Sequence, residues 1–90
     1  MQIELSNIKN RNNIIDIRTS IEFEGYNILG SKNIPRLNLL KSPEVYLNKC
    51  EEYYLICNKG EVSLSCSKIL NALGYNCYSI KGGIDNLKKR

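Results

Sequence analysis

The sequence contains no histidine, and its four cysteines form no Cys-x-x-Cys pair. Zinc sites in proteins use histidine and cysteine ligands at short, regular spacing. The thiols of this chain, Cys50, Cys57, Cys66 and Cys77, do not follow such spacing. We therefore expect no zinc site, and nothing else in the sequence implies a metal.

Long apolar segments are absent as well. No stretch reaches the roughly 18 apolar residues that a membrane-spanning helix needs, and the N-terminus MQIELSNIKN lacks the charged start and apolar run of a signal peptide. We therefore expect a cytoplasmic protein with no membrane partner. Because the cytosol keeps thiols reduced, the four cysteines are not expected to form two structural disulfides. Each cysteine is instead expected either to pack in the core as a small apolar side chain or to carry a reactive thiol.

A strong charge of one sign is also lacking. The 13 Lys and Arg residues against 9 Asp and Glu residues give a net charge of +4, which is spread along the chain apart from a basic cluster at residues 88–90. Nucleic-acid-binding proteins gather basic residues on one face or add aromatic stacking platforms. Neither pattern is present, so we expect no nucleic-acid partner.

Strand-like and helix-like segments alternate along the 90 residues, which are enough for one domain, 1–90, with a modest core. The predicted strands are residues 2–5, 13–17, 31–34, 53–57 and 76–80. The predicted helices are residues 19–25, 37–47 with an interruption near Pro43, 61–73 and 84–89. This alternation predicts a three-layer α/β domain, in which helices flank a mostly parallel sheet of about five strands.

Local signals support individual elements. Thr19 and Glu22 have the spacing of a capping box at the start of a helix. The apolar positions Val62, Cys66, Ile69, Leu70 and Leu73 form a helical stripe. The strands at 13–17 and 53–57 lack alternating polar residues, which is typical of strands covered on both faces.

Cys57 ends the predicted strand 53–57, directly before a short loop and a helix. In open parallel sheets, functional sites lie at the carboxyl ends of the strands. Gly60 permits a tight loop whose N–H groups, together with those of the helix's first turn, converge above the sulfur and favour the thiolate. Lys59 adds a positive charge and Ser63 a hydroxyl donor. The pattern suits a nucleophile that carries an anionic group, and the alternative is a buried cysteine that only fills space.

Five further segments occur in order around the cysteine loop. They are Asp16-Ile17-Arg18, Glu22-Phe23, YNILGSKNIP at 26–35, SKILNALGY at 67–75 and GGIDNL at 82–87. They resemble the D-V-R, E-F, G-H-I-x-G-A-x-N-I-P, A-x-x-L-x-x-x-G-Y and G-G-x-x-x-W motifs of the rhodanese-like domain, a sulfurtransferase family with a persulfide-forming cysteine. The family's active-site loop commonly reads C-R-x-G-x-R-S, and the corresponding residues here are CNKGEVS at 57–63. The resemblance covers nearly the whole chain.

The resemblance implies that Cys57 attacks the outer sulfur of thiosulfate or of a persulfide donor. The Cys57 persulfide then passes its sulfur to a thiol, to cyanide or to a sulfur-carrier protein, with no metal or organic cofactor. The substrate-binding residues implied by the family loop are Asn58, Lys59, Gly60, Glu61, Val62 and Ser63. We expect Asp16 and Arg18 to be structural, pairing with loops or with Glu22.

The chain departs from the family pattern at several positions. Tyr26-Asn27 replaces the G-H pair, Leu87 replaces the tryptophan, and the two arginines of the loop are missing. Glu61 stands where a neutral or basic residue is usual. Its carboxylate either repels thiosulfate or points to solvent from the first helical turn, where a negative charge is favourable.

Two other functions are compatible with a loop cysteine in this architecture. The cell-cycle phosphatases share this architecture but need an arginine six residues beyond the nucleophile to clamp phosphate, and that position is Ser63 here. A phosphatase is therefore disfavoured. The alternative that remains is a persulfide carrier, or a non-catalytic protein-binding module with weak thiosulfate activity.

The remaining cysteines have simpler explanations. Cys66 falls on the helical stripe and Cys77 on an apolar strand, so both are expected in the core. Cys50 lies in a polar stretch and is expected to be exposed.

Overall fold

The computed structural model describes residues 1–88. The strands are β1 (Gln2–Ile3), β2 (Ile14–Asp16), β3 (Lys32–Asn33), β4 (Glu52–Ile56) and β5 (Asn76–Ile80). The helices are α1 (Ser20–Gly25), α2 (Arg36–Lys41), α3 (Pro43–Tyr46), α4 (Glu61–Ala72) and α5 (Gly83–Lys88), with short 3-10 turns at Leu5–Asn7 and Arg11–Asn13. The predicted end of the last helix at Lys89 lies outside the described residues. Within residues 1–88, no helix has both the length and the apolar character needed to cross a membrane.

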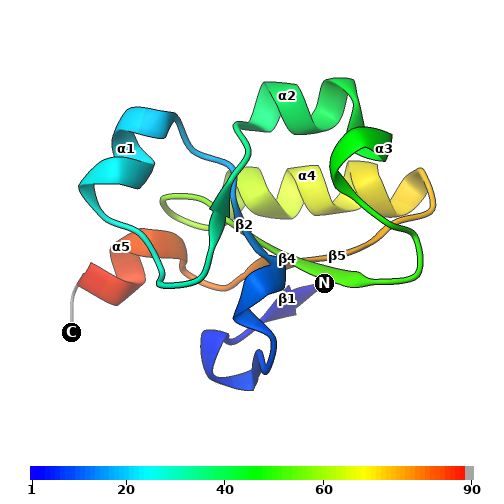
Figure 1. The fold of residues 1–90 in the computed structure, drawn as a ribbon. Helices are drawn as coiled ribbons and strands as arrows, with labels where there is room; N and C mark the ends of the chain where they lie inside the picture. The colour runs from blue at the N-terminus through cyan, green and yellow to red at the C-terminus, as the bar shows by residue number, and fades with distance from the viewer. Residues whose placement is uncertain (89–90) are drawn as a thin grey trace.

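The five strands form one sheet in the order β1-β5-β4-β2-β3, and every neighbouring pair is parallel. The prediction of a mostly parallel five-stranded α/β sheet is therefore confirmed. The helices α2, α3 and α4 lie together along one side of the sheet, while α1 and α5 lie beyond the carboxyl ends of the strands (Figure 1). Because parallel strands all end at the same edge, the loops after β2, β4 and β5 meet there.

The core has two parts, one on each face of the sheet. Along β4, Tyr53 and Leu55 belong to the cluster that packs against α2 and α4, whereas Ile56 belongs to the second cluster together with Ile84 of α5. Successive side chains of a strand point to opposite faces. Cys57 continues the alternation of Tyr53 and Leu55, so its side chain points toward the α4 side.

The inner face of α4 differs from the predicted stripe. The buried residues of the helix are Ser63, Cys66, Ser67 and Leu70. Val62, Ile69 and Leu73 have exposed fractions of 46%, 48% and 51%, so the predicted stripe is wrong for these three positions. The spacing of the buried set, i, i+3, i+4 and i+7, defines one helical face. The two serines on that face have hydrogen-bond partners, Ser63 at Cys57 and Gly60 and Ser67 at the carbonyl oxygen of Leu64.

Two predicted local signals are present at the ends of helices. Thr19 Oγ1 accepts from Glu22 N at 3.3 Å, and Glu22 Oε1 accepts from Thr19 N at 3.2 Å, which completes the capping box of α1. The interruption predicted near Pro43 separates α2 from α3, with Pro43 in the first turn of α3. Proline is favoured there because the first-turn N–H has no helical partner to lose.

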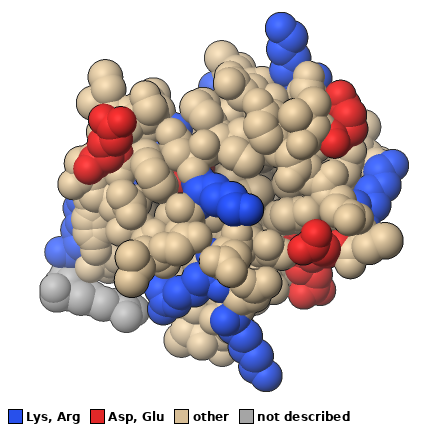
Figure 2. Space-filling view, viewed as in Figure 1, with Lys and Arg blue, Asp and Glu red and all other residues tan. Residues whose placement is uncertain are grey.

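Charged side chains are scattered over the face shown in Figure 2, with basic and acidic groups interspersed. No large patch of one sign gathers on that face. This distribution agrees with the spread of charge along the sequence.

Candidate active site

The sulfur of Cys57 receives backbone hydrogen bonds from the loop that follows it. Gly60 N donates to Cys57 Sγ at 3.1 Å, and Ser63 N donates at 3.3 Å. The side chain of Cys57 is almost completely buried, with 5% of the residue exposed. The N–H groups come from the loop and from the first turn of α4, whose positive dipole end points the same way. The arrangement stabilises negative charge on the sulfur.

Gly60 is the residue that lets the loop close. Its φ of +101° lies in the left-handed region, which side chains other than glycine rarely adopt. A Cβ at this position would also lie 3.3 Å from the backbone nitrogen of Gly82. The turn therefore needs glycine both for its conformation and for its closeness to the segment after β5.

A second glycine brings α5 against the same loop. Ile84 N donates to Cys57 O at 2.9 Å, and Asp85 N donates to Asn58 O at 2.9 Å. Gly83 precedes these residues with a φ of +64°, and a Cβ there would lie 2.5 Å from the carbonyl oxygens of Cys57 and Asn58. The absence of a side chain at Gly83 thus allows the first turn of α5 to bind the backbone of the cysteine loop.

A cavity of about 550 Å³ opens in front of Cys57. It is lined by residues of the β2–α1 connection and of α1 (Ile17, Arg18, Thr19, Glu22), of the segment that enters α2 (Pro35, Arg36, Leu37, Asn38), and of the cysteine loop and the first turn of α4 (Cys57, Asn58, Lys59, Glu61, Val62). Of the loop residues expected to bind substrate, Gly60 and Ser63 are not among the lining residues. Those two instead contact the sulfur through their N–H groups.

Arg18 has a structural role in this site. It forms a buried ion pair with Asp16, in which Arg18 Nη2 donates to Asp16 Oδ2 at 2.8 Å and Nε donates to Oδ1 at 3.0 Å. Arg18 Nη2 also donates to the carbonyl oxygen of Tyr26 at 2.6 Å. The hydrogen bond and charge of Asp16 raise the pKa of Arg18. The predicted pairing with a loop is confirmed, whereas no ion pair with Glu22 forms among the described residues because Asp16 occupies the guanidinium.

Asn58 connects the cysteine loop to α1. Asn58 Nδ2 donates to Glu22 Oε2 at 2.9 Å, and Arg18 Nη1 donates to Asn58 Oδ1 at 3.5 Å. The hydrogen bond from Asn58, followed by those from Thr19, lowers the pKa of Glu22. Asn58, whose side-chain amide donates one hydrogen bond and accepts another, therefore occupies the position where the family loop commonly has arginine. The sequence alone gave no indication of this bridge.

Three residues that shape the site were not singled out from the sequence. Arg36 and Leu37 form part of the cavity wall. They directly follow the N-I-P segment, and that motif is the sequence feature that could have pointed to them. Ser79 lies on β5 with its Oγ 2.6 Å from Ser63 Oγ. No local pattern marks Ser79, because only the sheet brings it near the cysteine loop.

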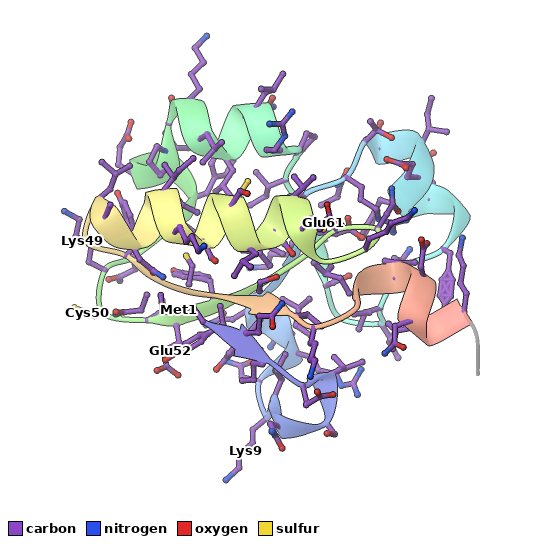
Figure 3. All side chains as sticks on the ribbon, turned by 180° about the vertical axis from the view of Figure 1, so that it is seen from behind. Met1, Lys9, Lys49, Cys50, Glu52 and Glu61 are labelled. Carbon is purple, nitrogen blue, oxygen red and sulfur yellow. The ribbon has the colours of Figure 1, made fainter. Side chains whose placement is uncertain are left out.

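The other thiols differ from Cys57 in burial. Burial raises the pKa of Cys66, and it raises the pKa of Cys77 to about 12. Both are buried, as predicted, and Cys50 is exposed, as predicted. Figure 3 shows Cys50 near the C-terminal end of α4, whereas Glu61 stands at the start of that helix.

These environments predict selective thiol labelling. Treated with N-ethylmaleimide near neutral pH, the folded protein is expected to lose the Cys50 and Cys57 thiols while Cys66 and Cys77 remain free. In urea all four should react. Peptide mass mapping measures the labelling, and rapid modification of Cys66 or Cys77 in the folded protein would contradict the expectation.

The raised pKa of Cys77 also predicts how the free energy of unfolding depends on pH. The contribution of this buried thiol is complete below its ordinary pKa of 9.0 and is lost as the pH rises toward about 12.

The family model described as the rhodanese-like domain matches residues 1–90. The uncharacterized protein YqhL of Bacillus subtilis is 37% identical over 71 residues, which cover 78% of this chain and 56% of YqhL. The chain therefore spans little more than half the length of that relative.

Solved structures share the fold. The protein SSP1007 of Staphylococcus saprophyticus is 35% identical, with a TM-score of 0.76 over 82% of this chain and 73% of that one. A rhodanese-related protein from Thermoplasma volcanium is 28% identical, with a TM-score of 0.77 over 86% of this chain and 76% of that one. The sheet order, the cysteine loop and these matches agree, and this chain belongs to the rhodanese-like domain family.

Proposed function

We propose that this rhodanese-like domain is a sulfurtransferase whose nucleophile is Cys57. The observation that carries the proposal is the pair of N–H groups, from Gly60 and Ser63, that donate to Cys57 Sγ beside an open cavity. Donors in this arrangement stabilise a thiolate and, after sulfur transfer, a persulfide anion. Family membership supports the same chemistry, since many rhodanese-like proteins are sulfurtransferases.

The reaction has two half-reactions that balance without a metal or an external oxidant. In the first, the Cys57 thiolate attacks the outer sulfur of thiosulfate, and the electron pair of the donor's S–S bond leaves with sulfite. With an organic persulfide as the donor, the leaving group is that donor's thiolate. In the second, a thiolate or cyanide attacks the terminal sulfur of the Cys57 persulfide, and Cys57 leaves as a thiolate. The cysteine is thus a covalent carrier that splits one transfer into two.

The cavity supports an anionic donor that is larger than thiosulfate. Its volume of about 550 Å³ exceeds what a small inorganic anion fills. Pro35, Leu37 and Val62 provide apolar walls, Arg36 and Lys59 provide positive charge, and Glu22 and Glu61 provide negative charge. An organic persulfide whose carboxylate reaches Arg36 or Lys59, or the persulfide of a carrier protein, matches this combination of apolar and charged surface better than a small dianion does.

The first test is intact-mass spectrometry of the reduced protein after mixing with thiosulfate and, separately, with glutathione persulfide. We expect a gain of one sulfur that cyanide removes and that Cys57→Ser abolishes. Cys50→Ser, which removes the exposed thiol far from the cavity, is the matched control and should load normally. If neither donor loads Cys57 while Cys50 reacts freely, the enzyme proposal fails.

The carboxylate of Glu61 is expected to weaken the use of thiosulfate. Glu61 lines the cavity, so its charge opposes the approach of a dianion. Replacing it in Glu61→Gln is expected to raise kcat/KM for thiosulfate by roughly threefold to tenfold at low salt, with a smaller gain at high salt. Glu44→Gln removes an acidic residue in the first turn of α3, away from the cavity, and should leave kcat/KM unchanged. Equal effects of the two substitutions would rule out a local role for Glu61.

A persulfide carrier is the second candidate. The missing loop arginines and the carboxylate of Glu61 at the cavity favour it over rapid thiosulfate turnover. A carrier would load from glutathione persulfide or from a protein persulfide and would fail to load from thiosulfate even in Glu61→Gln. A non-catalytic binding module would load from none of these donors.

A further inference from the structure

A pair of buried hydroxyl groups lies beneath the sulfur of Cys57. Ser63 Oγ is 3.3 Å from Cys57 Sγ, and Ser79 Oγ is 2.6 Å from Ser63 Oγ. Both hydroxyls are also 3.2 Å from the carbonyl oxygen of Gly60. Ser63 and Ser79 each have an exposed fraction of 0%, so water does not compete for these bonds. The chain of contacts therefore runs from β5 through α4 to the sulfur.

When Cys57 is a thiol, its proton and the two serine hydroxyl protons can all be donated to acceptors within the cluster. The thiol donates to Ser63 Oγ, because a thiol sulfur carries a proton that it can share. Each serine hydroxyl then donates to the Gly60 carbonyl oxygen or to the other serine. Every polar atom has a partner, as buried polar atoms require.

The thiolate requires a different arrangement. Its sulfur has no proton to donate, so the Ser63 hydroxyl turns to donate to it. Ser63 Oγ then needs a donor of its own, and Ser79 Oγ is within reach at 2.6 Å. The carbonyl oxygen of Gly60 is not left without a partner, because Leu64 N donates to it at 3.1 Å within α4. A rotation of two hydroxyls thus converts the site from holding a thiol to holding an anion.

We propose that Ser79 is a positioning residue, which directs the Ser63 hydroxyl toward the Cys57 sulfur and so stabilises the anionic forms of that sulfur. The inference rests on the proposed role of Cys57 as the nucleophile. Ser79 suits the task because it is held on a central strand, where its backbone pairs with Leu55 of β4 and its N–H donates to Met1 O at 2.9 Å. Within residues 1–88 its hydroxyl hydrogen-bonds with Ser63 Oγ and with the carbonyl oxygen of Gly60, and neither of these residues lines the cavity.

The test measures how readily Cys57 forms its thiolate, without any sulfur donor. In a Cys50→Ser background, the rate of Cys57 alkylation by iodoacetamide is followed against pH by mass spectrometry. Ser79→Ala is expected to move the midpoint of this profile upward by about one pH unit and to slow alkylation at neutral pH by roughly threefold to tenfold, since hydrogen bonds to charged groups are among the stronger ones. Other ionisable groups near the sulfur are Arg18, Glu22, Arg36, Lys59, Glu61 and Cys66. All six are unchanged by the substitution.

Two controls separate this role from general packing. Ser67→Ala removes another buried hydroxyl of α4, whose Oγ donates to Leu64 O at 2.8 Å, and should leave the midpoint unchanged. On a Ser63→Ala background, Ser79→Ala should add no further shift, because Ser79 acts through Ser63. Where the alanine variant does not fold, Ser79→Thr and Ser79→Val provide a pair of equal shape, of which only the threonine should keep the wild-type midpoint.

The inference is overturned by an unchanged midpoint in Ser79→Ala, by an equal shift in Ser67→Ala, or by shifts of Ser63→Ala and Ser79→Ala that simply add. Failure of the role proposed for Ser79 can be told apart from failure of the proposed sulfurtransferase function. A protein that never accepts sulfur from any donor still shows the alkylation profile. A protein that transfers sulfur but shows no shift in Ser79→Ala retains the function without this device.

Discussion

Replacing Arg18 with alanine is expected to lower the free energy of unfolding by about 3–5 kcal/mol, because it leaves a buried carboxylate without its partner. Asp16 has an exposed fraction of 0%, and Arg18 supplies three of its side-chain hydrogen bonds, at 3.0, 3.2 and 2.8 Å. The loss is a large share of the stability of a small domain. Urea denaturation followed by circular dichroism measures it.

An exposed ion pair provides the matched control. Lys81 Nζ lies 3.8 Å from Glu4 Oε2, with side-chain exposures of 64% and 55%. Lys81→Ala should change the free energy of unfolding by less than about 0.5 kcal/mol, because solvent screens such pairs. The double variant Asp16→Asn with Arg18→Met should recover much of the stability lost in Arg18→Ala. An Arg18→Ala protein as stable as Lys81→Ala would contradict the structural role of the buried pair.

The second large effect is expected at Gly83. In Gly83→Ala, a Cβ would lie 2.5 Å from the carbonyl oxygens of Cys57 and Asn58, at a φ of +64° that side chains rarely adopt. Backbone strain of this kind costs about 1–3 kcal/mol, and relief of the contact would move α5 away from the cysteine loop. We therefore expect both a lower free energy of unfolding and slower alkylation of Cys57.

Gly25→Ala is the control for Gly83→Ala. A Cβ at Gly25 meets nothing within 4 Å, and Gly25 ends α1 without a positive φ. This substitution should leave stability within about 1 kcal/mol of wild type, on the favourable side, because alanine is the better helix former. If Gly83→Ala matches Gly25→Ala in both stability and alkylation rate, the close approach of α5 does not hold the loop.

Several family motifs therefore support the cysteine loop. Asp16 and Arg18 fix the end of β2, and Asn33 Nδ2 donates to the carbonyl oxygens of both, at 3.0 Å each. Gly83 lets α5 bind the loop backbone from the other side. The loop is thus held between rigid elements, which keeps its N–H groups directed at the Cys57 sulfur.

The sequence by itself determined the α/β order, the capping box at Thr19, the break at Pro43 and the place of Cys57 at a strand end. These features depend on residues that are close together in the chain, so periodicity, caps and turn residues reveal them. The tertiary structure alone decided which face of α4 is buried, which carboxylate binds Arg18, and that Ser79 lies beneath the active-site loop. Parallel pairing of distant strands and close packing create those contacts, and no local pattern encodes which of several compatible partners a side chain will meet.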